Sequence, residues 1–210
     1  MQRSVFSCLV AALLTAAASA ETYVVNPQGT GDFPTIQAAL DSVVTGDVIE
    51  LTNGVFRGDG NRDVSFRGKS VTVRSQSGDP EVCMISCEAS PTDRHRGFVF
   101  ESQETRGAVL EDVTIRDGCE YWGGGIACEW SSPTIRGCVF RSNESPGSEG
   151  GGICILDEAA PLVEDCIFVE NSAYHGGAVS SCWAYSGYAP DIVRCTFLFN
   201  TADEGGAVRY

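Results

Sequence analysis

The fold of this chain is decided by three copies of one segment in its second half: SPTIRGCVFRSN at 132–143, APLVEDCIFVEN at 160–171 and APDIVRCTFLFN at 189–200. Each copy has a proline five residues before a cysteine, a phenylalanine two residues after it and an asparagine five residues after it. Successive cysteines are 28 and 29 residues apart. A repeat of this length predicts a solenoid, in which each copy buries its apolar face by stacking on the next.

The spacing within each copy predicts which side chains face inward. Residues two apart on an extended strand point to the same side, so each cysteine shares a face with the following phenylalanine. If the copies are turns of a parallel coil, like residues lie about 4.8 Å apart along its axis. Asparagine amides at a bend can then hydrogen-bond the neighbouring turn. We therefore predict three structural columns: Cys138, Cys166 and Cys195; Phe140, Phe168 and Phe197; Asn143, Asn171 and Asn200.

Glycine runs separate the copies and predict sharp corners, because glycine reaches positive φ without strain. Short strands are expected after these corners, at 126–128, 153–155 and 178–179. A weaker copy at 109–118 has Val113, Ile115 and Gly118 at the cysteine, phenylalanine and asparagine places. No helical periodicity is found in this half of the chain.

The N-terminal part is less regular. Apolar residues at helical spacing predict an amphipathic helix over about 34–44, with Pro34 in its first turn and Asp32 just ahead of it. We expect this helix to cover the open end of the coil, where strand edges are unpaired. Strands are predicted at 23–25, 48–51, 64–66 and 71–74, and a loop within 85–106.

The two ends of the sequence carry separate predictions. Arg3 is followed by an apolar run and by small residues at 18–20, a pattern typical of a secretory signal peptide. We predict a signal peptide over 1–20 and one β-helix domain over 21–210, with no later stretch long enough to span a membrane. Because 205–210 stops where another strand should begin, we expect the domain to continue in a longer protein.

The charge and the cysteines bound the environment. With 28 acidic and 14 basic residues the net charge is −14, and it becomes −15 once Arg3 is removed with the signal peptide. Such a surface repels nucleic acid and anionic lipid, which excludes both as main partners. Nine of the ten cysteines remain after Cys8 is lost, so at least one is unpaired, and Cys83 with Cys87 suggests a local disulfide or structural pair.

With these motifs in hand, the chain resembles the right-handed parallel β-helix proteins of the pectate-lyase-like superfamily. The segment NPQGTGDFPTIQAALDS at 26–42 is similar to the start of pectin methylesterases and other β-helices, and the repeats are similar to those of polymorphic outer-membrane proteins. The resemblance implies an all-β, right-handed parallel β-helix with an N-terminal capping helix. It implies no single activity, because this superfamily includes lyases, hydrolases, esterases and adhesins.

The sequence predicts no catalytic residue, no metal site and no cofactor, although the resemblance to lyases leaves calcium open. The motifs of methylesterases, polygalacturonases and lyases are not found in it. The acidic pairs Asp112 with Asp117 and Glu120 with Glu129 would serve a glycosidase only if their carboxyls lay about 5–10 Å apart. Solvated surface acids are the simpler interpretation.

Aromatic residues at corners and loops are the best functional lead, because sugar rings stack on flat exposed side chains. Those predicted to bind a ligand are Trp122, Trp130, Tyr174, Trp183, Tyr185 and Tyr188. The first hypothesis is a secreted or cell-surface β-helix with a binding or structural role, its partner a polysaccharide or cell-surface glycan. The alternative is a polysaccharide lyase or pectinesterase-like enzyme whose catalytic residues lie in a missing region.

Overall fold

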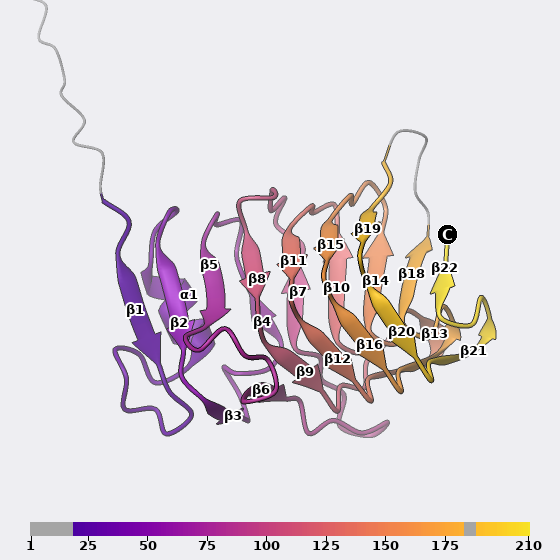
Figure 1. Cartoon of the computed structure of the whole chain (residues 1–210), viewed down its shortest axis with the longest axis horizontal. Coiled ribbons are helices and arrows are strands. Elements are labelled where there is room, and N and C mark those ends of the chain that lie inside the picture. Colours follow the sequence, from indigo (N-terminus) through magenta and orange to yellow (C-terminus); the bar gives the residue numbers. More distant parts are fainter. Residues whose placement is uncertain (1–18, 183–187) are drawn as a thin grey trace, which may run out of the picture.

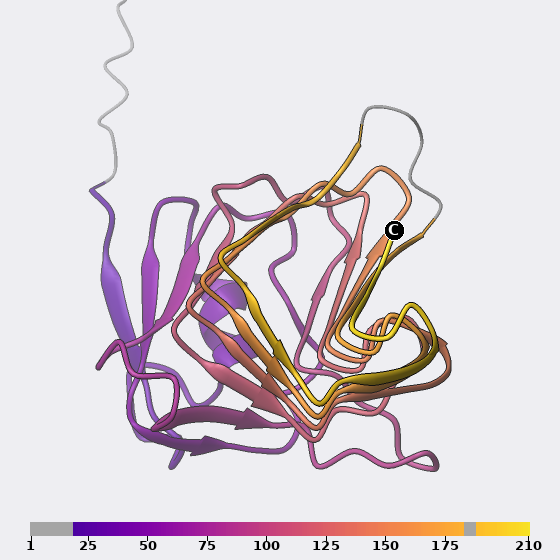
Figure 2. The ribbon, with the colours of Figure 1, turned by 45° about the vertical axis from the view of Figure 1, so that its right-hand side comes forward.

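The structure, a computed structural model, describes residues 19–182 and 188–210. Over these residues the chain forms a right-handed parallel β-helix of about seven turns, which confirms the predicted fold class (Figure 1). In the oblique view of Figure 2 the later turns lie almost over one another. One continuous apolar core fills the coil from Val25 to Val179.

Four parallel sheets run along the described part of the coil, each taking one strand from successive turns. The first sheet contains β1 (Thr22–Val25), β2 (Val48–Leu51), β5 (Thr72–Ser75), β8 (Val109–Glu111), β11 (Thr134–Arg136), β15 (Leu162–Glu164) and β19 (Asp191–Val193). The second contains β3 (Gly54–Phe56), β6 (Cys83–Ser86), β9 (Thr114–Arg116), β12 (Val139–Arg141), β16 (Ile167–Val169) and β20 (Thr196–Leu198).

Within the described residues the third sheet has six strands, and the fourth has three, all from the C-terminal turns. The third contains β4 (Val64–Ser65), β7 (Phe98–Phe100), β10 (Ile126–Glu129), β14 (Ile153–Leu156), β18 (Val179–Cys182) and β22 (Val208–Arg209). The fourth contains β13 (Glu144–Glu149), β17 (Ser172–His175) and β21 (Thr201–Glu204). The strands predicted from the glycine corners are β10, β14 and β18. The fourth sheet has no counterpart in the sequence prediction, because β13 contains proline and glycine and does not read as a strand.

The bend between the first and second sheets takes one residue per turn in the left-handed backbone region. These residues are Asp112, Gly137, Asp165 and Arg194, with φ of 56°, 62°, 54° and 54°. The left-handed conformation costs a non-glycine residue roughly 1–2 kcal/mol. The pairing of the strands on either side must therefore hold Asp112, Asp165 and Arg194 in it. Because three of these four residues are not glycine, the positions of glycines in the sequence do not predict this bend.

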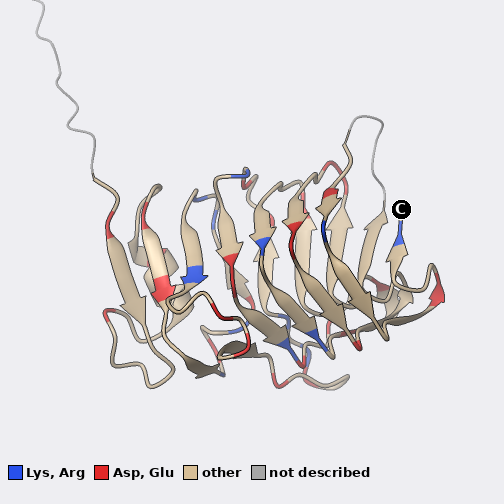
Figure 3. Cartoon of the chain, in the orientation of Figure 1, with Lys and Arg blue, Asp and Glu red and all other residues tan. Residues whose placement is uncertain are grey.

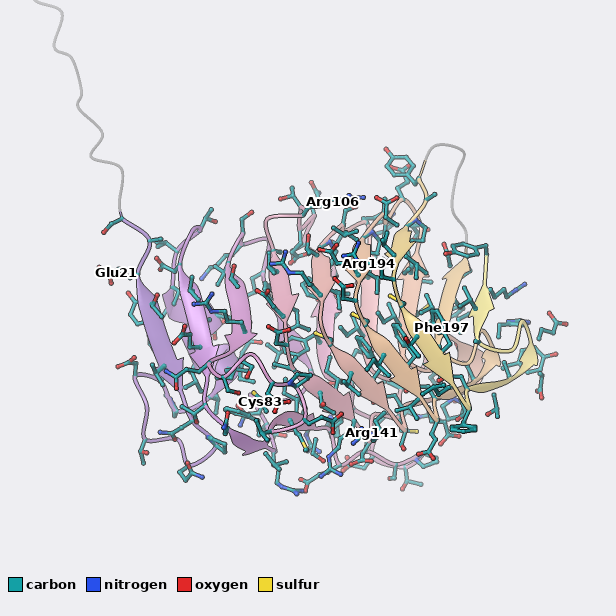
Figure 4. The ribbon with its side chains drawn as sticks, viewed as in Figure 1. Glu21, Cys83, Arg106, Arg141, Arg194 and Phe197 are labelled. Carbon is teal, nitrogen blue, oxygen red and sulfur yellow. The ribbon has the colours of Figure 1, made fainter. Side chains whose placement is uncertain are left out.

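The phenylalanines lie in register on the second sheet. Phe140 pairs with Phe168, and Phe168 with Phe197. Their rings stack with centroids 4.7 and 5.1 Å apart, and Phe197 is labelled in Figure 4. Ile115 pairs with Phe140, so the weaker copy at 109–118 occupies the preceding turn in the expected register.

The asparagines form a hydrogen-bonded series, the asparagine column Asn143, Asn171 and Asn200. Nδ2 of Asn143 donates to Oδ1 of Asn171 at 3.0 Å, and Nδ2 of Asn171 donates to Oδ1 of Asn200 at 2.9 Å. Gly118 takes the asparagine place in the turn before, where its backbone N–H donates to Oδ1 of Asn143 at 3.0 Å. Asn143 and Asn171 are fully buried. The amides therefore satisfy backbone groups that water cannot reach.

The N-terminal helix is shorter than predicted: α1 spans Ile36–Ser42. Thr35 caps it, accepting a hydrogen bond from the backbone N–H of Ala38 at 3.2 Å, so Pro34 precedes the helix and does not stand in its first turn. Asp32 instead binds the backbone N–H of Val24 at 2.7 Å. The buried face of α1 packs near β1, β2 and β4, in the first turns of the coil.

The segment 85–106, expected to carry a loop, contains β7 and a loop at 87–97, with β6 ending at Ser86. Cys83 and Cys87 are free thiols four residues apart, too far along an extended chain for a disulfide.

The predicted signal peptide at 1–20 lies almost entirely outside the described residues. In the described part of the chain no helix is long and apolar enough to cross a membrane.

Charges alternate along the outer face of the first sheet. The residues in register there are Glu50, Arg74, Glu111, Arg136 and Glu164. Figure 3 shows this alternation of acidic and basic strand ends. Arg74 binds Glu50 at 2.7 Å, and Arg136 binds Glu111 at 3.1 Å. The row pairs opposite charges across turns, so the charges of Arg74 and Arg136 are neutralised locally.

Candidate functional site

Small side chains lie on the outer face of the third sheet. Val99 of β7, Ala127 of β10, Cys154 of β14 and Ser180 of β18 are in register. Their strand neighbours, such as Ile126, belong to the apolar core, so this row points away from it. Ala127, Cys154 and Ser180 are nevertheless buried.

A cavity of about 250 Å³ opens on this face, and we call it the Trp122 cavity. Its lining residues come from four turns and from the loops that lead into β4, β7 and β10: Asp63, Arg96, Val99, Glu101, Trp122, Ala127, Glu129 and Leu156. The lining combines one aromatic ring, three carboxylates and one guanidinium. Asp63 and Arg96 come from the segments before β4 and β7, whereas Glu101 and Glu129 stand at the C-terminal ends of β7 and β10.

Arg96 holds the turn that presents the tryptophan. Its Nη1 donates to the Trp122 carbonyl at 2.8 Å, and its Nη2 donates to the Tyr121 carbonyl at 2.9 Å. Its backbone N–H donates to Oδ1 of Asp63 at 2.9 Å. Burial lowers the pKa of Arg96, whereas the nearby Glu120 and Asp63 act to raise it. Trp122 has φ of 57° and a 37% exposed surface, so a strained turn keeps a large ring at the cavity wall.

His95 supports the same wall. Its Nδ1 lies 2.5 Å from Oδ2 of Asp63, and its Nε2 lies 3.3 Å from Oδ1 of Asp93. Arg94 lies over the ring of Tyr121, with its guanidinium carbon 3.8 Å from the ring centroid, and donates to the tyrosine hydroxyl at 3.0 Å. The sequence alone predicted neither contact: Asp93 lies two residues before His95 in the same loop, and Asp63 comes from the loop before β4.

The other predicted aromatic residues are spread over the coil. Trp130 is 57% exposed just after β10 and does not line the Trp122 cavity. Tyr174 of β17 is exposed and lines a second cavity with Glu144 and Asp203. Tyr188 is exposed before β19. Trp183 and Tyr185 lie outside the described residues.

The predicted acidic pairs are replaced by a different one. Asp112 and Asp117 stand at opposite ends of β9, and Glu120 does not line the cavity that contains Glu129. Glu129 lies instead beside Glu101: these residues directly follow Cys128 and Phe100, which pair across adjacent turns. The two glutamates are 28 residues apart, one period of the repeat, so their spacing was the sequence signal for this pair.

A second polar cluster lies where the third and fourth sheets meet. Glu149, His175 and Glu204 are in register on β13, β17 and β21. The His175 ring nitrogens lie 2.6 Å from Glu149 and 3.1 Å from Glu204. Ser180 and Arg209 also bind the carboxylate of Glu149, which is 8% exposed. This cluster borders a cavity of about 340 Å³.

Within the described residues, no group of three or more histidine, cysteine or acidic side chains is placed to hold a metal ion. No protein-family model, no curated protein and no solved structure matches this chain. The fold and the side-chain geometry are therefore the basis for inferring a function.

Proposed function

We propose that this chain is an extracellular or cell-surface β-helix that binds carbohydrate in the Trp122 cavity. The observation that supports this most is the Trp122 ring, which lies partly exposed at the wall of a cavity lined by carboxylates. Sugar rings present C–H faces that stack on aromatic rings and hydroxyls that hydrogen-bond polar groups around them. The export of the chain rests on the predicted signal peptide at 1–20.

The wall is held in place before any ligand arrives. Arg96 binds the carbonyls of residues 121 and 122, and Asp63 binds both Arg96 and His95. A binding surface whose side chains are already fixed loses less conformational entropy on association. Stacking on Trp122 therefore adds to affinity without an ordering cost for the loop.

The charge of the cavity indicates which sugars suit it. Asp63, Glu101 and Glu129 face one guanidinium, that of Arg96, which is already bound to two carbonyls. A uronate would meet this excess of negative charge, whereas neutral hydroxyls can donate to the carboxylates and an amino sugar can form an ion pair. We therefore favour neutral or amino sugars over acidic polysaccharide.

The test is a glycan array that contains neutral, amino and uronic acid oligosaccharides, followed by calorimetry on the strongest ligand. We expect Trp122→Ala to weaken binding at least about tenfold, a loss of about 1.4 kcal/mol. Trp130→Ala is the matched control, since that ring is more exposed and lies outside the cavity. A silent array, or equal losses in both variants, would refute the proposal.

A carbohydrate-active enzyme is the second candidate, favoured by the register of Glu101 and Glu129. Residues one strand spacing apart have backbones about 4.8 Å apart, and retaining glycosidases place their two carboxyls about 5–5.5 Å apart. This role would be supported if the wild type hydrolyses the bound glycan and Glu129→Gln still binds the glycan but no longer hydrolyses it. Release of unsaturated products from polygalacturonate with calcium would instead favour a lyase.

A further inference from the structure

The cysteine column, Cys138, Cys166 and Cys195, stacks thiols on three successive turns. The backbone N–H of Ile167 donates to the Cys138 carbonyl, and that of Thr196 to the Cys166 carbonyl, both at 2.9 Å. These bonds fix the register, so Cα atoms of adjacent cysteines lie about 4.8 Å apart. Disulfides join Cα atoms about 4.4–6.8 Å apart. Neighbours in the column are therefore close enough to be bridged.

The three thiols make the same backbone contact but differ in burial and in their thiol neighbours. Each Sγ donates to the carbonyl two residues earlier in its own turn, at 3.3, 3.3 and 3.4 Å for Cys138, Cys166 and Cys195. Hydrogen bonds with both neighbours raise the pKa of Cys166. The hydrogen bond from Cys166 lowers the pKa of Cys195 to about 7, against the effect of burial. Cys195 is half-buried, and the other two are buried.

Among the other cysteines, Cys128 is paired with Phe100 on one side and Ile155 on the other. Cys154 and Cys182 share the outer face of the third sheet, and burial together with a hydrogen bond with Cys182 raises the pKa of Cys154. Cys154 pairs with Ser180, however, so its backbone is not directly opposite that of Cys182. Cys166 and Cys195 are directly opposite each other, which is the closer arrangement for a disulfide.

We propose that Cys166 and Cys195 form a disulfide between adjacent turns when the chain meets a small-molecule disulfide such as oxidised glutathione. The Cys195 thiolate attacks one sulfur of glutathione disulfide, forming a mixed disulfide and releasing one glutathione thiolate. The Cys166 thiol then loses its proton and attacks the Cys195 sulfur, which displaces the second glutathione. Two protein thiols are oxidised to one disulfide, and one glutathione disulfide is reduced to two glutathione molecules.

The bridge is independent of carbohydrate binding, because the cysteine column lies at the bend between the first and second sheets and the Trp122 cavity lies on the third. Arg194 and Phe197, labelled in Figure 4, flank Cys195 in the chain and mark the turn that the disulfide would fix. Cys138 is buried and remains a thiol in this scheme.

The experiment treats the full chain, purified under reducing conditions, with oxidised glutathione and then with N-ethylmaleimide, before digestion and mass spectrometry. We expect a peptide pair linked through Cys166 and Cys195, and two fewer thiols in the denatured protein. The rate of oxidation should rise as the pH increases through about 7, since the thiolate is the attacking species.

Cys166→Ser and Cys195→Ser should each abolish the linked peptide, while Cys128→Ser, a buried cysteine outside the column, should leave it intact. The wild-type peptide map needs no variant, so a variant that fails to fold does not weaken the test. All thiols remaining free after oxidation, or a linked pair such as Cys154 with Cys182 in place of the expected one, would overturn the proposal.

Discussion

Replacing Asn171 by alanine is predicted to destabilise the coil more than the same replacement at Asn200. Asn171 is fully buried in the middle of the asparagine column. Its Oδ1 accepts hydrogen bonds from the backbone N–H and from Nδ2 of Asn143, both at 3.0 Å. Its Nδ2 donates to the Phe140 carbonyl at 3.0 Å and to Oδ1 of Asn200 at 2.9 Å.

The magnitude follows from the groups left without partners. Asn171→Ala leaves two buried donors of Asn143 without an acceptor: the backbone N–H of Asn143 and one proton of its side-chain amide. The other amide proton of Asn143 still binds the Ile115 carbonyl. An orphaned buried donor costs about 1–3 kcal/mol, so two of them predict a loss of about 4 kcal/mol. Alanine at 200 orphans the equivalent donors of Asn171, but on a half-buried turn where water can replace the amide, and we expect about 1–2 kcal/mol.

The assay is urea unfolding of the wild type, Asn171→Ala and Asn200→Ala, followed by circular dichroism and by tryptophan fluorescence. The change in free energy of unfolding is the shift in midpoint multiplied by a common slope. Both probes must give coincident transitions, because solenoids can unfold in parts. Equal effects of the two substitutions, or a loss below about 1 kcal/mol for Asn171→Ala, would refute the reasoning.

Three further predictions concern packing, backbone and charge. Phe168→Ala, which removes the central ring of the phenylalanine stack, should cost about 3–5 kcal/mol by urea unfolding, whereas Phe168→Leu should cost less than about 1.5 kcal/mol. Gly124→Ala would place a Cβ 2.3 Å from the Glu144 carbonyl oxygen and should cost about 3 kcal/mol or more in free energy of unfolding. Gly147→Ala, whose Cβ meets nothing within 4 Å, should cost about 1–2 kcal/mol. Similar urea midpoints for the two variants would contradict this. The hydrogen bond from Arg74 lowers the pKa of Glu50. The stabilisation of the fold by ionised Glu50 is therefore complete above pH about 4.5 and is lost as the pH falls through the lowered pKa. The difference in urea midpoint between wild type and Glu50→Gln should shrink on acidification, and a difference that grows would contradict this pH dependence.

The repeat predicted the parts of the fold that depend on local spacing. The distance of two residues between Cys166 and Phe168, and of five between Cys166 and Asn171, gave the period, the parallel winding and the register of the second sheet. The fourth sheet was beyond this reasoning because β13 has the composition of a turn. Its backbone is held extended by pairing with β17, a contact that exists only after the coil has formed.

Of the residues that line the cavity, the sequence pointed to Trp122 alone, as a ligand-binding residue, and that role stays a prediction. Glu101 and Glu129 are 28 residues apart, the same spacing as Cys138 and Cys166, so the repeat period could have paired them; the pairing of Phe100 with Cys128 shows that register. Asp63 and Arg96 lie in loops whose lengths follow no period, so no pattern in the sequence places them.

This contrast has a physical cause that bears on function. Residues in the columns stack on equivalent residues of the turns above and below, so each position favours a side chain that packs in register. The loop at 87–97 is free of this constraint, and it brings Arg94 and Arg96 against the turn at 121–122. Part of the lining of the Trp122 cavity therefore comes from segments outside the columns, which is why we place binding there. Stacking in register instead brings like cysteines together, which is why we place the disulfide within the columns.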